Sequence, residues 1–336
     1  LREIMMIRRK SYARAGLVGN PSDGYFGKTI SFIVKNFEAE VILYESPELE
    51  ILPAARDHSV FPGGIGELAQ DVGFFGYYGG IRLLKATVKR FHDYCAEAGH
   101  KLHERNFTLR YASNVPSQVG MAGSSAIITA CLRCLIDFYG VKIPCGVQPN
   151  LILSVENDEL GIPAGLQDRV IQVFEGLVFM DFKRSVMAQQ GYGIYEELSP
   201  ELLPPLYIAY TTALSEGTEV FHNDIRGRFN RGEKDVIDAM EEWAELAEQV
   251  RERILAGKGT SIGELLDANF DLRRKLYQMS EGNIRMVEEA RACGASAKFT
   301  GSGGAIVGTY EGEEMFQNLK RRLEPLGMNV FIPEII

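Results

Sequence analysis

The chain has 336 residues, of which 46% are hydrophobic and 24% charged; this is ordinary usage for a globular protein and excludes wholesale disorder. The 36 lysines and arginines against 45 aspartates and glutamates give a formal net charge of −9. This charge makes a protein that coats nucleic acid or an anionic membrane a poor match. The 35 glycines exceed ordinary usage, so their positions are the first question.

Cellular location is indicated by what the sequence lacks. No apolar run approaches the ~18 residues of a membrane-spanning helix, and the first residues lack the order of a signal peptide. The five cysteines include a C-x-x-C pair, Cys131 and Cys134, inside an apolar stretch with helical spacing. We expect buried structural thiols there rather than a redox or metal site. The sequence therefore predicts a cytoplasmic monomer or homodimer with no nucleic-acid and no membrane partner.

The N-terminal part of the chain alternates strand-like and helix-like segments. Runs of β-branched and aromatic residues predict strands, and apolar residues three or four apart predict helices. In chain order we expect a strand over 12–18, strands within 29–44, a helix over 79–98, a strand over 107–111, helices over 124–138 and 151–160, a short helix after 165, and a strand over 177–182.

The composition changes after residue 182. Residues 185–205 mix polar, glycine and proline residues, which predicts a linker. We expect two α+β domains, an N-terminal one over 1–195 and a C-terminal one over 196–336. The elements expected beyond the linker are a strand over 206–210, helices over 234–255, 261–279 and 283–292, two strands around a glycine loop within 298–310, and a closing helix and strand.

The strongest local signal is the glycine-rich run over residues 116–126. Its small residues let a ligand approach the backbone, and the helix that follows presents unpaired N–H groups and the positive end of its dipole. Ser124 and Ser125 could cap that helix, donate to a phosphate or complete a metal shell. An anion-binding loop and an ordinary glycine turn with a serine cap both fit the run.

Two further glycine clusters occupy residues 19–27, after the first strand, and residues 300–305, between two strand-like runs. The ordinary interpretation of the second is a hairpin turn. Glu156 lies on an expected helix, and Asp168 follows a turn that contains glycine and proline. One acid could hold Mg²⁺ while the other orients or deprotonates a hydroxyl. Alternatively, Glu156 belongs to a solvated acidic face and Asp168 caps a helix.

The order of these motifs resembles that of the GHMP small-molecule kinases, and within them the glucuronokinases. The resemblance extends from about residue 11 to residue 310. It implies a ribosomal-S5-like N-terminal domain and a ferredoxin-like C-terminal domain, in agreement with the α+β expectation. The segments that carry it are residues 13–23, 19–27, 77–84, 105–109, 116–126, 160–169 and 298–305.

The implied activity is transfer of the γ-phosphoryl group of ATP, with Mg²⁺, to the anomeric hydroxyl of D-glucuronate. The product would be glucuronate 1-phosphate, for UDP-glucuronate salvage. Asn20 and Pro21 replace the Glu-His of galactokinase-type first motifs, which favours a sugar other than galactose. A GHMP kinase for galacturonate or a heptose phosphate, and a catalytically silent sugar sensor of this fold, are the alternatives.

Roles in phosphoryl transfer carry over by position. Asp168 matches the catalytic aspartate, and Arg14 matches the basic residue that polarises the nucleophile. Ser125 and Glu156 match the Mg²⁺ ligands. The residues expected against the ATP phosphates are Gly120, Met121, Ala122, Gly123, Ser124, Ser125 and Ala126.

Sugar contacts are also implied. The matching positions are Asn20, Asp23, Tyr25 and Asp168, with Gly301, Ser302 and Gly303 closing the site from the second domain. A uronate carboxylate needs a cation, ideally an arginine, which can donate two parallel hydrogen bonds. Arg82, in one matching segment, is the candidate; the other interpretation is a surface arginine on a helix.

Overall fold

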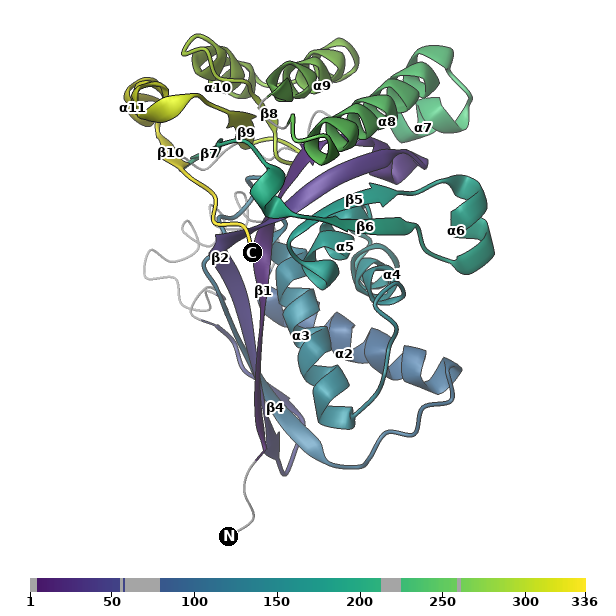
Figure 1. Ribbon diagram of the computed structural model, residues 1–336. Helices are drawn as coiled ribbons and strands as arrows, with labels where there is room; N and C mark the ends of the chain where they lie inside the picture. Colours follow the sequence, from purple (N-terminus) through teal and green to yellow (C-terminus); the bar gives the residue numbers. More distant parts are fainter. Residues whose placement is uncertain (1–4, 55–56, 58–78, 213–224, 259–260) are drawn as a thin grey trace, which may run out of the picture. The chain divides into compact units, whose positions relative to one another are not determined.

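The computed structural model describes residues 5–54, 57, 79–212, 225–258 and 261–336 (Figure 1). Residues 77 and 78 of the matched segment 77–84 lie outside this set. The chain forms two compact units, each assembled from separate segments, and the division at residue 195 stays a prediction. Unit 1 comprises Leu1–Ala13, Phe37–Val115 and Ala122–Val173; unit 2 comprises Arg14–Asn36, Pro116–Met121 and Phe174–Ile336.

Unit 1 is a layer of strands with helices packed along it (Figure 1). Strand β2 pairs antiparallel with β4, which places Ala39 opposite Ser113. Strand β3 pairs parallel with β4, and β1 pairs with β2; both β1 and β2 continue into unit 2. The elements are β1 (Met6–Val18), β2 (Lys28–Ser46), β3 (Glu50–Ile51), β4 (Asn106–Ser113), α2 (Gly80–Glu97), α3 (Gly123–Tyr139), α4 (Gln148–Ser154), η2 (Val155–Glu159) and α5 (Gln167–Phe174).

The core of unit 1 lies between these strands and the helices α2 and α3, which pack side by side (Figure 1). Leu84 and Phe91, seven residues apart on α2, are both buried, as the helical spacing predicts. Cys131 and Cys134 lie wholly buried on α3, so the expectation of structural thiols is confirmed. This apolar packing holds in place the first turn of α3, where the glycine run ends.

The helices and strands expected in the N-terminal part are confirmed, with two differences. The segment 29–44 belongs to one 19-residue strand, β2, rather than to several strands. The helix expected over 151–160 ends as α4 at Ser154 and continues as the π-helical turn η2. Single π-helical turns inside α-helices are frequent at functional sites, and this one carries Glu156.

Unit 2 contains a four-stranded antiparallel sheet in the order β10-β7-β9-β8. Phe270, Val287 and Leu319, from three successive helices, pack on it around Tyr207. The start of β2 pairs antiparallel with β5, and β5 with β6. The elements are η1 (Ser22–Tyr25), β5 (Leu177–Asp181), α6 (Arg184–Gln190), β6 (Ile194–Leu198), η3 (Pro200–Leu202), β7 (Leu206–Thr211), α7 (Ile225–Asn230), α8 (Lys234–Leu255), α9 (Gly263–Leu276), α10 (Glu281–Arg291), β8 (Lys298–Phe299), β9 (Ala305–Thr309), α11 (Gly312–Leu323), η6 (Glu324–Leu326) and β10 (Met328–Phe331).

The linker expected over 185–205 is wrong. This segment forms α6 and the strand β6, whose Leu198 lies opposite Leu177 of β5. Tyr195 contacts Phe174 and Phe182 edge to face, which anchors the strand. The segment is rich in polar residues because most side chains of β6 stay exposed or half-buried, a pattern that resembles a linker when pairing partners are unknown. Among the described helices, none is long and apolar enough to cross a membrane.

Candidate active site

Arg14 lies between two glycine loops of unit 2. Its Nη1 donates to the carbonyl oxygen of Gly120 at 2.5 Å and to that of Thr300 at 3.0 Å. Its backbone N–H donates to the carbonyl of Met121 at 3.2 Å. Arg14 as a whole residue is only 4% exposed, so these carbonyls stabilise its buried charge. Within unit 2, the end of the first strand, residues 116–121 of the glycine run and the 300–305 cluster therefore meet at Arg14.

The two glycine loops pack backbone against backbone. Gly120 has a left-handed φ of +66°, and a Cβ on it would lie 3.0 Å from Ser302 N. A Cβ on Gly301 would lie 2.5 Å from the carbonyl oxygen of Gly120. Residues 300–304 connect β8 to β9 as the hairpin interpretation predicts. Only glycine permits so close an approach, so this hairpin also holds Gly120 in place.

The first glycine cluster is organised by a buried lysine. Lys298 is 1% exposed, and its Nζ donates to the carbonyl of Gly16 and to Oδ1 of Asn20, both at 2.6 Å. Burial, with Arg273 and Arg14 nearby, holds the pKa of Lys298 well below its ordinary value. This contact fixes the amide orientation of Asn20, with its oxygen toward Lys298.

Arg273 is a second buried cation in unit 2. It donates from Nη1 to the carbonyl of Gly301 at 2.9 Å, and burial lowers its pKa. The charge of Asp23 acts on it in the opposite direction. Sequence reasoning assigned no role to Arg273, because it lies on the amphipathic helix α9 outside any motif. Its place beside the third glycine loop follows only from tertiary packing.

Tyr25, at the end of η1, packs against helix α7. The guanidinium of Arg226 lies 4.2 Å from the centroid of its ring, and the Phe229 ring contacts it edge to face at 4.9 Å. Arg226 also donates from Nη1 to the carbonyl of Gly24 at 2.6 Å. These contacts hold the Asp23–Tyr25 turn against unit 2's own helices.

In unit 1 the glycine run becomes the first turn of α3. The first helical bond runs from the N–H of Ala126 to the carbonyl of Ala122 at 3.1 Å, so the three N–H groups before it have no partner within the helix. Ala122 adopts a left-handed φ of +60° at the N-cap. Such successive N–H groups at a helix N-terminus attract anions.

Glu156 is paired with a serine from this turn. Ser124 Oγ donates to Glu156 Oε1 at 2.7 Å, whereas Ser125 Oγ donates to the carbonyl of Ala122 at 3.2 Å. Glu156 is 1% exposed. The interpretation of Glu156 as part of a solvated acidic face is therefore wrong, because its carboxylate is buried beside the glycine run.

Arg169 links the two acids. Its Nη2 donates to Glu156 Oε2, and its Nη1 donates to Asp168 Oδ2 at 3.1 Å and to the carbonyl of Gly165 at 2.9 Å. Arg169 lies in the matched segment 160–169, but it was assigned no role from the sequence. The sequence signal that could have pointed to Arg169 was its position next to Asp168, one helical turn after the glycine that precedes α5.

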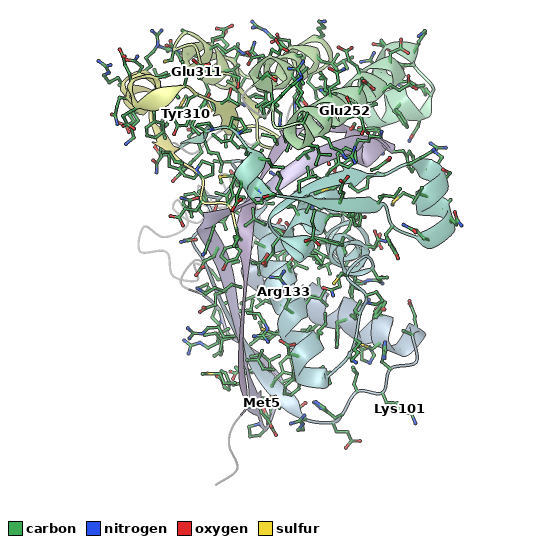
Figure 2. All side chains as sticks on the ribbon, viewed as in Figure 1. Met5, Lys101, Arg133, Glu252, Tyr310 and Glu311 are labelled. Atoms are coloured by element: carbon green, nitrogen blue, oxygen red, sulfur yellow. The ribbon has the colours of Figure 1, made fainter. Side chains whose placement is uncertain are left out.

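Helix α5, which carries Asp168, is tied to α3 by Arg133, whose position is labelled in Figure 2. Arg133 Nη2 donates to the carbonyl of Gln172 at 2.7 Å, and Nη1 donates to that of Lys10 at 2.7 Å. Gln172 Nε2 in turn donates to the carbonyl of Ala122 at 3.0 Å. These bonds fix the helix of Asp168 relative to the glycine run within unit 1.

Comparison with known proteins gives the family. A model of the GHMP kinases N terminal domain matches residues 82–176. The chain is 47% identical over 308 residues to a probable glucuronokinase 2 of Arabidopsis thaliana, which covers 90% of this chain and 84% of that protein. Glucuronokinase 1 of the same plant is 46% identical over 306 residues, with the same coverage. The chain belongs to the glucuronokinase family of GHMP kinases.

A solved structure agrees on the fold. Galactokinase of Lactococcus lactis complexed with galactose superposes with a TM-score of 0.74 at 16% identity, covering 99% of this chain and 94% of that one. The expected α+β GHMP kinase fold is thereby confirmed, and as a member of this family the chain is an ATP-dependent kinase.

The acids of unit 1 have suitable chemistry for a hard cation. Glu156 offers a buried carboxylate oxygen next to the hydroxyl of Ser124, and Mg²⁺ prefers oxygen ligands. The part of the chain that the structure describes holds no cluster of three or more His, Cys, Asp or Glu that could bind a metal. Mg²⁺ commonly takes one or two carboxylates and completes its shell with substrate phosphates and water. The residues present therefore fit a nucleotide-bound Mg²⁺.

Arg82, the sequence candidate for binding a carboxylate, lies half-buried on the first turn of α2. Its backbone N–H donates to the carbonyl of Gly79 at 3.2 Å. Helix α2 packs against η2, the turn that carries Glu156. Arg82 thus belongs to unit 1, with Glu156 and Asp168, whereas Asn20, Asp23 and Tyr25 belong to unit 2.

Proposed function

We propose that this protein transfers the γ-phosphoryl group of ATP to the anomeric hydroxyl of D-glucuronate, giving glucuronate 1-phosphate. The observation that carries the proposal is 47% identity to a probable glucuronokinase over 90% of the chain. The buried Ser124–Glu156 pair at the start of α3 supports phosphate and metal chemistry there. The reaction would serve UDP-glucuronate salvage in the cytoplasm, by a monomer or a homodimer.

The glycine run and Glu156 would bind the triphosphate. The N–H groups of Gly123, Ser124 and Ser125 lie at the positive end of α3 and suit phosphate oxygens. Glu156 with a serine hydroxyl, that of Ser125 by resemblance or of Ser124 by the contact seen, would hold Mg²⁺. When bound, that ion neutralises charge on the transferring phosphate. The chain as a whole is acidic, so these local groups must supply the positive field.

Two residues would act on the sugar hydroxyl. Asp168 would orient the anomeric hydroxyl and accept its proton, because a carboxylate within hydrogen-bond reach is a competent general base. Arg14 would stabilise negative charge in transfer, held in position by the carbonyls of Gly120 and Thr300. Sugar contacts are proposed for Asn20, Asp23, Tyr25, Asp168, Gly301, Ser302 and Gly303.

A coupled assay of ADP release across a panel of sugars tests the proposal. Glucuronate, galacturonate, a heptose phosphate and galactose would be compared at equal concentrations. We expect turnover with glucuronate. Silence with every sugar would instead support the sensor, and turnover with galactose alone would reject a uronate substrate.

Asp168→Asn tests the base assignment. We expect the variant to lose turnover while a fluorescent ATP analogue still binds, since the amide keeps the shape but cannot accept a proton. A near-normal kcat would show that another group takes the proton.

Arg82→Met tests the sequence candidate for the carboxylate. If Arg82 pairs with the uronate, the KM for glucuronate rises far more than the KM for ATP. Equal changes in the two KM values would remove Arg82 from this role.

A further inference from the structure

Arg169 is a buried cation that contacts two acids, the proposed metal ligand and the proposed general base. Its side chain is 3% exposed, and those of Glu156 and Asp168 are 2% and 16% exposed. A buried charge is strongly unfavourable unless it is paired, so the guanidinium and the two carboxylates stabilise one another. The fork of Arg169 contacts each acid through a different nitrogen, which a lysine ammonium could not reproduce in the same geometry.

The two carboxylate oxygens of Glu156 have different hydrogen-bond partners. Oε2 accepts from Arg169 Nη2, whereas Oε1 accepts from the hydroxyl of Ser124 at 2.7 Å. A guanidinium N–H directed at Oε2 repels a cation from that oxygen by charge and by volume. The serine hydroxyl beside Oε1 is neutral and can turn its own oxygen toward a cation. Glu156 is thus prepared to coordinate through Oε1 alone.

Coordination through one oxygen discriminates between divalent cations. Mg²⁺ requires near-ideal octahedral geometry at about 2.0–2.1 Å and accepts single carboxylate oxygens, whereas Ca²⁺ takes about 6–8 ligands and often binds a carboxylate through both oxygens. We propose that Arg169 is a positioning residue that restricts Glu156 to one-oxygen coordination and thereby makes the nucleotide site selective for Mg²⁺ over Ca²⁺. The proposal rests on the proposed function, in which Glu156 is a metal ligand.

The test measures metal binding rather than turnover. Protein in excess over a non-hydrolysable ATP analogue would be loaded with Mn²⁺, and Mg²⁺ or Ca²⁺ would displace it while electron paramagnetic resonance reports free Mn²⁺. Outer-shell partners of metal ligands are typically worth about 10–100-fold in metal affinity. In Arg169→Gln we expect a loss of this size for Mg²⁺ and a smaller loss or a gain for Ca²⁺, so the Mg²⁺/Ca²⁺ affinity ratio falls.

Arg133→Gln is the matched control. Arg133 also ties α5 to its surroundings, but it does so by donating to backbone carbonyls, including those of Lys10, Gln172 and Val173. If loosening of α5 alone explained the effect, this variant would show the same fall in the Mg²⁺/Ca²⁺ ratio. We expect its ratio to match that of the unmodified protein.

Arg169→Lys keeps the test decisive if the glutamine variant fails to fold. It retains the buried charge, but its single ammonium cannot hold both acids, so the ratio should still fall. An unchanged Mg²⁺/Ca²⁺ affinity ratio in every folded Arg169 variant overturns the inference about Arg169. That outcome does not bear on the proposed kinase function. If the unmodified protein phosphorylates no sugar but still prefers Mg²⁺ to Ca²⁺, and the Arg169 variants lose that preference, the proposed sugar transfer fails while the metal roles of Glu156 and Arg169 stand.

Discussion

Gly301→Ala perturbs the point where the two glycine loops of unit 2 meet. The added Cβ would lie 2.5 Å from the carbonyl oxygen of Gly120 and 3.0 Å from both terminal nitrogens of Arg14. Ordinary contact begins at 3.4 Å, so the loops must separate by about 0.9 Å. Gly301 is not among the residues with a left-handed φ, so the effect comes from space alone.

The expected magnitude follows from this displacement. Overpacking of a well-packed site costs about 1–3 kcal/mol, and stretching the 2.5 Å bond from Arg14 to Gly120 weakens the anchor of Arg14. A misplacement of about 1 Å near the reacting groups can lower a rate by about 10²-fold. We therefore expect a lower urea midpoint by equilibrium fluorescence and a kcat reduced by one to two orders of magnitude in the ADP-release assay.

Gly282→Ala is the control for this substitution. Gly282 lies on α10 with no atom within 4 Å of the added Cβ, so alanine there should be neutral or should stabilise by about 0.5–1 kcal/mol. If Gly301→Ala keeps the urea midpoint and kcat of Gly282→Ala, the close packing of the two loops does not exist in solution.

Two further predictions concern buried titratable groups. Between the lowered pKa of Lys298 and the ordinary value of a lysine, the unfolded chain binds more protons than the folded chain, so this residue adds stability as pH rises. Lys298→Met should flatten that rise on the acid side of the ordinary lysine pKa in urea titrations, and an identical slope in both proteins would contradict the shift. Burial raises the pKa of Cys134 to about 12 and that of Cys131 well above its usual range, whereas Cys145 is exposed. Iodoacetamide at about pH 8 should therefore label Cys145 in the folded protein and the other two only in urea, and mass spectrometry that finds Cys134 labelled as fast as Cys145 would refute its burial.

Much of the secondary structure was predictable because its signals are local. Helices α2 and α3 follow from apolar residues three or four apart, and β4 from alternation, since each pattern reflects one face turned to the core. The linker prediction failed for the complementary reason. Strand β6 is stabilised by pairing with β5 and by aromatic contacts, neither of which its own polar sequence shows.

The candidate site was predictable only in part. The glycine run, Glu156 and Asp168 were found because phosphate and metal chemistry require small residues, helix N-termini and carboxylates in a recognisable order. Lys298 and Arg273 were not predicted as site residues. A sequence does not show that a cation is buried, because its hydrogen-bond partners come from distant segments. Lys298 reaches Gly16 across 282 positions of the chain.

By itself, the sequence determined that this is an acidic α+β kinase with three glycine motifs and two acids between them. Its glycines and the periodic spacing of its apolar residues constrain the backbone only locally, within a few residues. Tertiary structure decided that Ser124 contacts Glu156, that Arg169 joins the two acids, and that Gly301 packs against Gly120. These are contacts between distant segments or between side chains on separate turns, so their geometry depends on how the core packs.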